Sequence, residues 1–348
     1  MSDSNSEPSR TELDNLGEFK LIEHLASQFT QKQQSTLLGI GDDAAVLIPD
    51  ANCNLLVTSD MLLEGVHFDL SYTPLKHLGY KAIAVNISDI AAMNGICTQV
   101  TVNIGLSNRF SLEAIDALYE GIQMACSHYQ CDLVGGDTTS SVTGLIISVT
   151  ALGYVGNDRL VKRSGAKHND LICVSGDLGA AYLGLQVLER EKQVFLANSE
   201  MQPQLDQYEY IVSRQLKAEA RTDVVTWFHE QGIVPTAMID VSDGLASDLL
   251  HICKQSVVGA RVYEDRLPIE AATKDAALEF NLNPGTVTLH GGEDYELLFT
   301  VDQKHHQSIE NQQGISVIGH ITDTGQGAEL VTASEEIVPL EAQGWRHF

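Results

Sequence analysis

Basic residues are scarce in this sequence. Its 348 residues contain 21 Lys and Arg against 47 Asp and Glu, which gives a formal net charge of −26 at pH 7. Nucleic-acid backbones and anionic membrane surfaces are negatively charged, so most of this surface would repel them. We therefore expect neither nucleic acid nor a membrane among the binding partners.

Long apolar runs are also missing. The longest nearly uncharged run, residues 145–155, is well short of the roughly 20 residues that cross a bilayer. Residues 1–10 are polar and acidic, without the basic start and apolar stretch of a signal peptide. We expect residues 1–16 to be a disordered tail on a cytoplasmic protein.

The cysteines form no recognisable framework. All six stand singly in apolar surroundings, without a C-x-x-C pair or histidines at zinc-ligand spacing, and we interpret them as buried thiols. The H-E-x-x-H, G-x-S-x-G and Walker-type patterns are absent as well. With 43% apolar residues and only 8 Pro, the composition is that of an ordinary globular protein.

Predicted strands and helices alternate along the chain, which favours an α/β protein of the α+β sandwich type. Up to a Gly-Asn-Asp-Arg break at 156–159, strands are predicted at 55–64, 99–106 and 145–154, and helices at 75–93 and 111–129. Beyond it, strands are predicted at 171–175, 237–241, 260–263, 297–301 and 315–318, helices at 180–190, 208–220, 222–231, 244–254 and 269–280, and a polar insertion at 192–205. We place the two domains at 17–156 and 157–348.

Six short acidic motifs, flanked by Gly, Ser or Thr, lie between the apolar segments. One such motif is usually a turn or a helix cap, but six are hard to explain in that way. Mg²⁺ takes oxygen ligands and commonly bridges carboxylates to substrate phosphates, so the set favours phosphoryl transfer. Asp60, Asp137 and Asp240 are predicted at or just after strand ends, where open α/β sheets bind ligands. The motifs are Gly39-Ile-Gly-Asp-Asp43, Thr58-Ser-Asp60, Asn86-Ile-Ser-Asp89, Gly135-Gly-Asp-Thr-Thr139, Asp240-Val-Ser-Asp243 and Gly291-Gly-Glu-Asp-Tyr-Glu296.

The first motif also contains a weak dinucleotide-binding pattern, Gly39-x-Gly41-x-x-Ala44. Asp42 and Asp43 would then face a pyrophosphate, and two unit charges about 4 Å apart repel by about 4 kcal/mol at an effective dielectric constant near 20. Nicotinamide binding is therefore disfavoured unless cations intervene. The glycines of Gly39-x-Gly41 and of Gly135-Gly136 let the backbone approach a ligand closely, and exposed N–H groups there could hold phosphate oxygens.

Taken in order, the motifs resemble those of the thiamine-monophosphate kinase family, within the superfamily of aminoimidazole ribonucleotide synthetase. The resemblance runs from Gly17 to the carboxyl end. It implies the two-domain aminoimidazole-ribonucleotide-synthetase-like fold, and transfer of the ATP γ-phosphoryl group to thiamine monophosphate with several Mg²⁺ ions. Its carriers are GIGDDAA (39–45), TSDMLLEGVHF (58–68), AVNISDIAAMNG (84–95), VGGDTT (134–139), RSGAK (163–167), IDVSDGLASDL (239–249) and GGEDYELLF (291–299).

The resemblance also implies roles for individual residues. Asp89, Asp137 and Asp243 are the expected catalytic residues, acting through metal. The expected metal ligands are Asp43, Thr58, Ser59, Asp60, Asp89, Asp137, Asp240 and Asp243. ATP is expected to contact Tyr119, Gly136, Asp137, Arg163 and Ser242, and thiamine monophosphate to contact His67, Glu293 and Trp345. His67, Trp345 and Tyr119 each have a competing interpretation as packed core side chains.

Several features leave room for other interpretations. Where the family continues Pro-Gly-Asp after RSGAK, this chain has His168-Asn169-Asp170, so the turn must close differently.

Two alternative functions are a synthetase of the same superfamily that acts through a phosphorylated amide, and a non-catalytic acidic protein that binds divalent metal. The resemblance further implies a homodimer formed through the sheet of the amino-terminal domain, which binds ATP and Mg²⁺, while the carboxyl-terminal domain completes the substrate site.

Overall fold

The computed structural model describes residues 18–38, 40 and 45–342. The chain divides into two compact units, one of residues 1–49, 57–86 and 97–152 and one of residues 50–56, 87–96 and 153–348. Each unit is built on a sheet of its own. Within the described residues, no helix combines the length and the apolar character needed to span a membrane.

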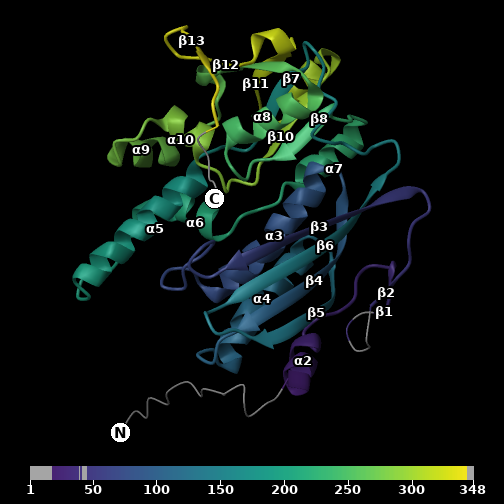
Figure 1. The fold of residues 1–348 in the computed structure, drawn as a ribbon, viewed down its shortest axis with the longest axis vertical. Helices are drawn as coiled ribbons and strands as arrows, with labels where there is room; N and C mark the ends of the chain where they lie inside the picture. The colour runs from purple at the N-terminus through teal and green to yellow at the C-terminus, as the bar shows by residue number, and fades with distance from the viewer. Residues whose placement is uncertain (1–17, 39, 41–44, 343–348) are drawn as a thin grey trace. The chain divides into compact units, whose positions relative to one another are not determined.

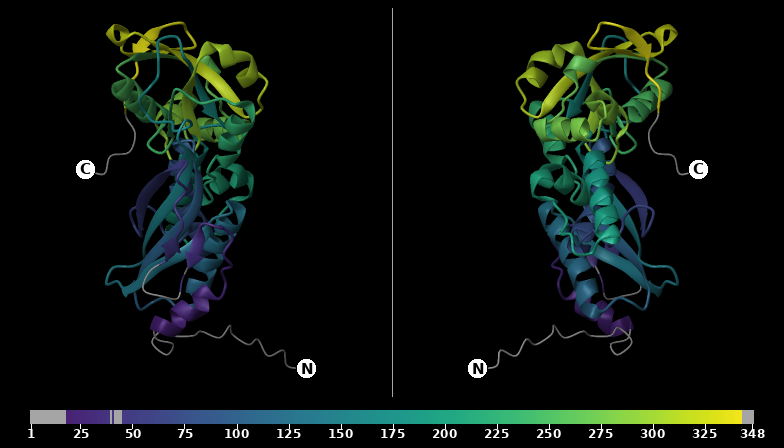
Figure 2. Two further views of the ribbon diagram at one scale, coloured as in Figure 1. Left: turned by 90° about the vertical axis from the view of Figure 1, so that its right-hand side faces the viewer. Right: turned by 90° about the vertical axis from the view of Figure 1, so that its left-hand side faces the viewer.

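The first unit is organised around a four-stranded sheet with helices on one face (Figures 1 and 2). Ser111 caps the second of these helices, because its hydroxyl oxygen accepts from the N–H of Ala114, as expected for serine at this position. Ile115, Leu118 and Ile122 form the buried stripe of that helix. The sheet order is β3 (Cys53–Leu63), β6 (Ile146–Gly156), β4 (Ile96–Leu106) and β5 (Asp132–Ser140), and the helices are α3 (Leu75–Ala92) and α4 (Leu112–His128).

Three smaller elements precede this sheet: α2 (Glu18–Ala26), β1 (Thr36–Leu38) and β2 (Val46–Leu47). The buried carboxylate of Asp132 fixes the segment before β1. It accepts from the main-chain N–H groups of Lys32 and Gln33 at 2.5 and 2.9 Å and from the Thr36 hydroxyl at 2.7 Å. These bonds satisfy a carboxylate that would otherwise be costly to bury.

The second unit contains a seven-stranded sheet that is apolar on both faces. Alternate residues of β7 (Leu171–Ser175) enter different cores: Ile172 and Val174 join one cluster, whereas Leu171 and Cys173 join the other. The sheet order is β13 (Ile337–Pro339), β12 (Ala328–Val331), β9 (Gly259–Tyr263), β11 (Ile315–Thr322), β7, β10 (Leu297–Val301) and β8 (Ala237–Asp240).

Helices supply the rest of both cores in the second unit. α8 (Leu245–Ser256) contributes Leu249 to one cluster, and α7 (Thr222–Gln231) contributes Phe228 to the other. The remaining helices include α5 (Ala180–Ala197), α6 (Glu209–Leu216), α9 (Ala271–Glu279), α10 (Pro284–His290) and α11 (His306–Glu310).

The expected elements are all present, most of them within a few residues of their predicted bounds, but one bound was clearly wrong and several elements were not predicted. Helix α5 continues to Ala197, into the segment expected to be a polar insertion. Its last turns are mostly exposed, and without a buried face the residues show no apolar period although they form helix readily. Elements without a counterpart among the predicted ones are helices α2, α10 and α11 and strands β1, β2, β5, β12 and β13.

The positions of two acidic residues also differ from expectation. Asp60 lies within β3 and Asp137 lies within β5, rather than at or after strand ends. Glycines and carboxylates are unusual in strands, so the sequence pattern did not indicate that a strand continues through Gly135, Gly136 and Asp137. Asp240 is the last residue of β8, as expected.

Candidate active site

Strand β5 and helix α4 bring three of the expected ATP-binding residues to one pocket. Tyr119, Gly136 and Asp137 line it together with apolar side chains that include Leu133 and Val102. A side chain at Gly136 is excluded, because a Cβ there would lie 1.9 Å from the carbonyl oxygen of Val102 on the paired strand β4. The bare backbone of β5 therefore forms a wall of the pocket, where N–H groups can approach a phosphate.

Tyr119 is a buried member of the same pocket. Burial raises the pKa of its phenol to about 12, so the side chain stays neutral. Its ring meets that of Phe29 edge to face at a centroid distance of 6.3 Å. Tyr119 is thus both a core residue and a pocket-lining residue, and the two interpretations of the sequence are compatible.

The three candidate metal ligands on strand β3, Thr58, Ser59 and Asp60, do not all point to the same face of the sheet. The Ser59 hydroxyl donates to the carbonyl oxygen of Val149 at 3.0 Å and lies 3.1 Å from the Thr150 hydroxyl. Successive side chains of a strand point to opposite faces, so Thr58 and Asp60 point away from Ser59. The structure therefore does not bring the Ser59 hydroxyl together with the Asp60 carboxylate.

Asn86 is a residue that the sequence analysis missed. Its amide oxygen accepts from the main-chain N–H of Asp60 at 3.1 Å, and its amide nitrogen donates to Ala82 within α3 at 3.0 Å. The side chain is 1% exposed. Asn86 thus fixes Asp60 on β3, and its place at the start of the Asn86-Ile-Ser-Asp89 motif was the available signal.

His67 lies in a tight loop after β3. Its ring nitrogen Nδ1 accepts from the main-chain N–H of Leu63 at 3.0 Å, and the main-chain N–H of His67 donates to the carbonyl oxygen of Leu63 at 2.9 Å. Neutral imidazole carries a single proton, and Nδ1 acts as an acceptor. The ring nitrogen of His67 that carries the proton is therefore Nε2.

In the second unit, Asp240 is the centre of an acidic cluster. It is 3% exposed, and its Oδ2 accepts from the Ser88 hydroxyl at 2.7 Å. Burial raises the pKa of Asp240 to about 7, and the neighbouring charge of Asp89 adds to the rise, while Arg163 opposes it. The structure thus brings together Asp89, Asp240 and Arg163, three residues singled out from the sequence.

The loop after Asp240 is held by an acid that the sequence analysis did not single out. Asp248, in the first turn of α8, accepts from the main-chain N–H groups of Ser242 and Asp243 at 3.1 and 3.3 Å. Burial, followed by the charges of Asp240 and Asp243, raises the pKa of Asp248 to about 8. Its position in the motif at 239–249 was the only sequence signal.

The basic turn before β7 closes as the altered sequence requires. Asn169 adopts a left-handed backbone with φ of 70°, which asparagine tolerates better than most residues. Asp170 then accepts from the N–H of Lys167 at 2.8 Å and from the Thr236 hydroxyl at 2.6 Å. The turn therefore forms without the Pro-Gly pair, and Arg163 keeps its place beside Asp240.

Glu293 lies in the segment that runs alongside the Asp240 loop. Its N–H donates to the carbonyl oxygen of Ser242 at 2.8 Å, and the N–H of Tyr295 donates to that of Val241 at 2.9 Å. Glu293 is therefore adjacent in space to Ser242. Two further expected residues, Asp43 and Trp345, lie outside the described residues.

The described acidic residues could supply a hard cation with two carboxylate ligands at a time, but they do not form a complete coordination shell. Among residues 18–38, 40 and 45–342, no three His, Cys, Asp or Glu side chains are grouped so that they could hold a metal ion by themselves. Asp89 and Asp240 nevertheless repel each other at a buried position, which a cation would relieve. Mg²⁺ commonly uses one or two carboxylates and completes its shell with water and phosphate, so these pairs suit it.

The two-domain fold agrees with the class of protein that the sequence matches. Residues 41–155 match the family model of AIR synthase related protein, N-terminal domain, and residues 168–331 match that of its C-terminal domain. Thiamine-monophosphate kinase of Bacillus subtilis (strain 168) is 33% identical over 341 residues, covering 96% of this chain and 100% of the relative. That of Aquifex aeolicus (strain VF5) is 33% identical, covering 97% and 99%. The chain belongs to the thiamine-monophosphate kinase family.

Solved structures agree with this assignment. Thiamine-monophosphate kinase from Stenotrophomonas maltophilia K279a superposes with a TM-score of 0.77 at 36% identity, covering 90% of this chain and 96% of the other. A structure described as AaThiL complexed with AMPPCP and TMP superposes with a TM-score of 0.75 at 31% identity, covering 99% of this chain and 100% of the other. The expected two-domain fold is confirmed.

Proposed function

We propose that this protein transfers the γ-phosphoryl group of ATP to thiamine monophosphate, giving ADP and thiamine diphosphate, as the last step of thiamine diphosphate biosynthesis. The observation that carries the proposal is the match to such kinases along nearly the whole chain at 33% identity. A structural relative described as bound to AMPPCP and TMP supports ATP and thiamine monophosphate as the two substrates.

The chemistry of the acceptor suits the side chains at hand. A phosphate monoester has a second pKa near 6, so the attacking oxygen is already ionised at neutral pH and needs no general base. Phosphoryl transfer then depends on in-line positioning and on neutralising charge. Tyr119 and the Gly136 backbone would position ATP, with Arg163 and Ser242 at its phosphates, whereas His67, Glu293 and Trp345 would orient thiamine monophosphate.

The carboxylates are proposed to hold Mg²⁺. Asp43, Thr58, Asp60, Asp89, Asp137, Asp240 and Asp243 are the side-chain ligands we propose, and Ser59 would need its main-chain carbonyl because its hydroxyl points to the other face of β3. When bound, Mg²⁺ neutralises the negative charge that accumulates on the phosphates. We assign ATP and most of these ligands to residues 17–156.

The decisive experiment is ³¹P NMR of the purified protein with ATP, Mg²⁺ and thiamine monophosphate, repeated with EDTA. The proposal requires thiamine diphosphate and ADP to appear only with metal and without free phosphate. Intact ATP, or release of phosphate alone, would contradict the assigned acceptor.

We also propose a homodimer formed through the sheet of the first unit. On the face that carries Ser59, strand β3 exposes Val57 by 62% and Met61 by 53%, although both are large apolar side chains. Such a row on an edge strand favours association with a second copy. Light scattering should therefore give about twice the 37.9 kDa of one chain. A Val57→Lys variant should be monomeric, whereas Val142→Lys, at a fully exposed loop position, should not.

A further inference from the structure

The segment from 291 to 296 has an unusual backbone. Gly292, Glu293 and Tyr295 have φ values of 71°, 62° and 53°, in the left-handed region that side chains other than glycine seldom adopt. Glu293 and Tyr295 thus flank Asp294 in a conformation that persists only when surrounding contacts impose it. Two carboxylates of the segment provide those contacts.

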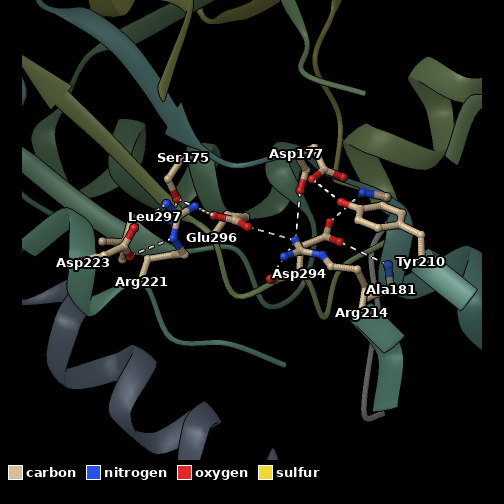
Figure 3. Close-up of polar contacts among 11 residues, drawn as sticks. Ser175, Asp177, Ala181, Tyr210, Arg214, Arg221, Asp223, Asp294, Glu296 and Leu297 are labelled. Atoms are coloured by element: carbon tan, nitrogen blue, oxygen red, sulfur yellow. Dashed lines mark hydrogen bonds and ion pairs between the residues drawn. The ribbon is translucent and has the colours of Figure 1, made fainter. Parts of the chain in front are cut away.

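The first anchor is Asp294, which is 2% exposed. Its carboxylate accepts from the N–H groups of Gly179 and Ala181 at 2.7 and 3.3 Å, at the start of helix α5 (Figure 3). A carboxylate is favoured at a helix N-terminus, where N–H groups lack partners within the helix. Asp294 is therefore held by a rigid element of the second unit.

The second anchor is Glu296, which is 1% exposed. Arg214 donates to its Oε1 at 2.9 Å and Arg221 donates to its Oε2 at 2.6 Å, so each oxygen is gripped by its own guanidinium (Figure 3). The Ser175 hydroxyl donates to Oε2 as well, at 2.6 Å. Paired charges with this many hydrogen bonds fix a side chain in one position.

The residue between these anchors, Tyr295, contacts the carboxylate of Glu293. Tyr295 is held on both sides by Asp294 and Glu296, and its hydroxyl donates to Oε1 of Glu293 at 3.0 Å. It is 9% exposed, so the ring is packed as well as anchored. The position of the Glu293 carboxylate is thereby coupled, through Tyr295, to two arginines in the interior of the unit.

We propose that Tyr295 is a positioning residue for thiamine monophosphate. Its hydroxyl orients the Glu293 carboxylate, and Glu296 with Arg214 and Arg221 fixes Tyr295 in its left-handed conformation. This inference rests on the proposed function, because it takes Glu293 as the residue that contacts thiamine monophosphate. Loss of the Tyr295 hydroxyl then weakens binding of that substrate and leaves ATP binding unchanged.

The test compares Tyr295→Phe with Tyr208→Phe, since each removes one hydroxyl that donates to a glutamate in the same unit. The Tyr208 hydroxyl donates to both oxygens of Glu279, at 2.6 and 2.7 Å, on helix α9. We expect Tyr295→Phe to raise KM for thiamine monophosphate about 10-fold, as for one lost hydrogen bond to a charged group. Tyr295→Phe should have the same KM for ATP and the same thermal midpoint as Tyr208→Phe. The control Tyr208→Phe should have wild-type KM values for both substrates.

A cycle with Glu293→Gln separates the two hypotheses. If Glu293→Gln raises KM for thiamine monophosphate and Tyr295→Phe adds nothing in that background, the positioning role is supported. If Glu293→Gln has an effect but Tyr295→Phe behaves like Tyr208→Phe, the positioning role is wrong while the proposed function stands. A wild-type KM in Glu293→Gln would overturn the substrate role of Glu293 itself.

A further variant tests the buried ion pair between Arg221 and Glu296. Arg221→Lys keeps the positive charge but loses the guanidinium geometry that grips Glu296 and Asp223. We expect it to raise KM for thiamine monophosphate more than KM for ATP. Equal changes in both constants would indicate a general structural role and would overturn the proposed coupling.

Discussion

The Ser88 hydroxyl donates a hydrogen bond of 2.7 Å to the buried Oδ2 of Asp240. Ser88 lies in helix α3, one residue before Asp89. This contact places the end of the Asn86-Ile-Ser-Asp89 motif beside the Asp240-Val-Ser-Asp243 motif, 152 residues further along the chain. Two acidic motifs therefore form one site, in which Asp89 acts electrostatically on Asp240.

Asp89→Asn should abolish most turnover without unfolding the protein. The change removes a proposed metal ligand but also removes the like charge that raises the pKa of Asp240, so the metal-free protein should be at least as stable as the wild type. We expect at least about a 100-fold loss of kcat, the scale for losing a group that organises transition-state charge. Steady-state kinetics and thermal unfolding in EDTA measure the two effects, with Asp275→Asn on the exposed side of α9 as the control. Near-normal turnover would contradict the ligand assignment.

Stability should depend on pH in a direction set by Asp248. Its folded-state pKa of about 8 lies above the value near 3.9 of an unfolded chain, so the folded protein binds the extra proton between these limits. Stability is therefore lost as pH rises through this window. In EDTA we expect the thermal midpoint to fall by about 5 °C between pH 5.5 and 8.5.

Mg²⁺ should oppose that fall, because it neutralises the same carboxylates, and its stabilising effect should be larger at pH 8.5 than at pH 5.5. Asp248→Asn keeps an oxygen for the N–H groups of Ser242 and Asp243 but cannot ionise, so its pH profile in EDTA should be flatter. Identical profiles for the variant and the wild type would show that another group governs the pH dependence.

The sequence predicted the elements of the fold better than the partners of its buried charges. Strand β7 and helix α7 were predicted to the residue, because apolar runs and their bounding residues are local signals. Arg214 and Arg221 stand in an ordinary polar stretch, and their shared partner Glu296 is 82 and 75 residues away. Such pairs depend on the tertiary fold, so no local pattern marks them.

The acidic motifs show the same limit on a smaller scale. Gly291-Gly-Glu-Asp-Tyr-Glu296 was predicted to be functional, but its letters do not show that Asp294 and Glu296 point inward and anchor the segment. In Thr58-Ser-Asp60, strand β3 turns the Ser59 side chain away from the Asp60 side chain, although the family resemblance implied that both residues bind metal.

Ser59→Ala should therefore be tolerated where Asp60→Asn is not. The Ser59 hydroxyl is bonded to Val149 on the face opposite to Asp60, and its loss leaves the main-chain carbonyl in place. We expect Ser59→Ala to keep kcat within about 2-fold and Asp60→Asn to lose at least about 100-fold, as for other groups that organise transition-state charge. Mg²⁺ titrations of both variants provide the measurement. A raised Mg²⁺ requirement in Ser59→Ala would show that its hydroxyl reaches the metal.

Substitutions at His67 test whether its ring nitrogen Nε2 donates a hydrogen bond to thiamine monophosphate. Because Nδ1 accepts from the main-chain N–H of Leu63, the ring proton is at Nε2, and Nε2–H is the group that would donate to thiamine monophosphate under the proposed substrate role. His67→Asn can still accept from Leu63 through its amide oxygen but has nothing at the Nε2 position, whereas His67→Gln places an N–H donor there and gives up the contact with Leu63. We expect about a 10-fold higher KM for thiamine monophosphate in His67→Asn, as for one lost hydrogen bond to a charged group, with a smaller rise in His67→Gln. If the order is reversed, with His67→Asn close to the wild type, the residue serves to shape the loop at 63–68 and does not donate to substrate.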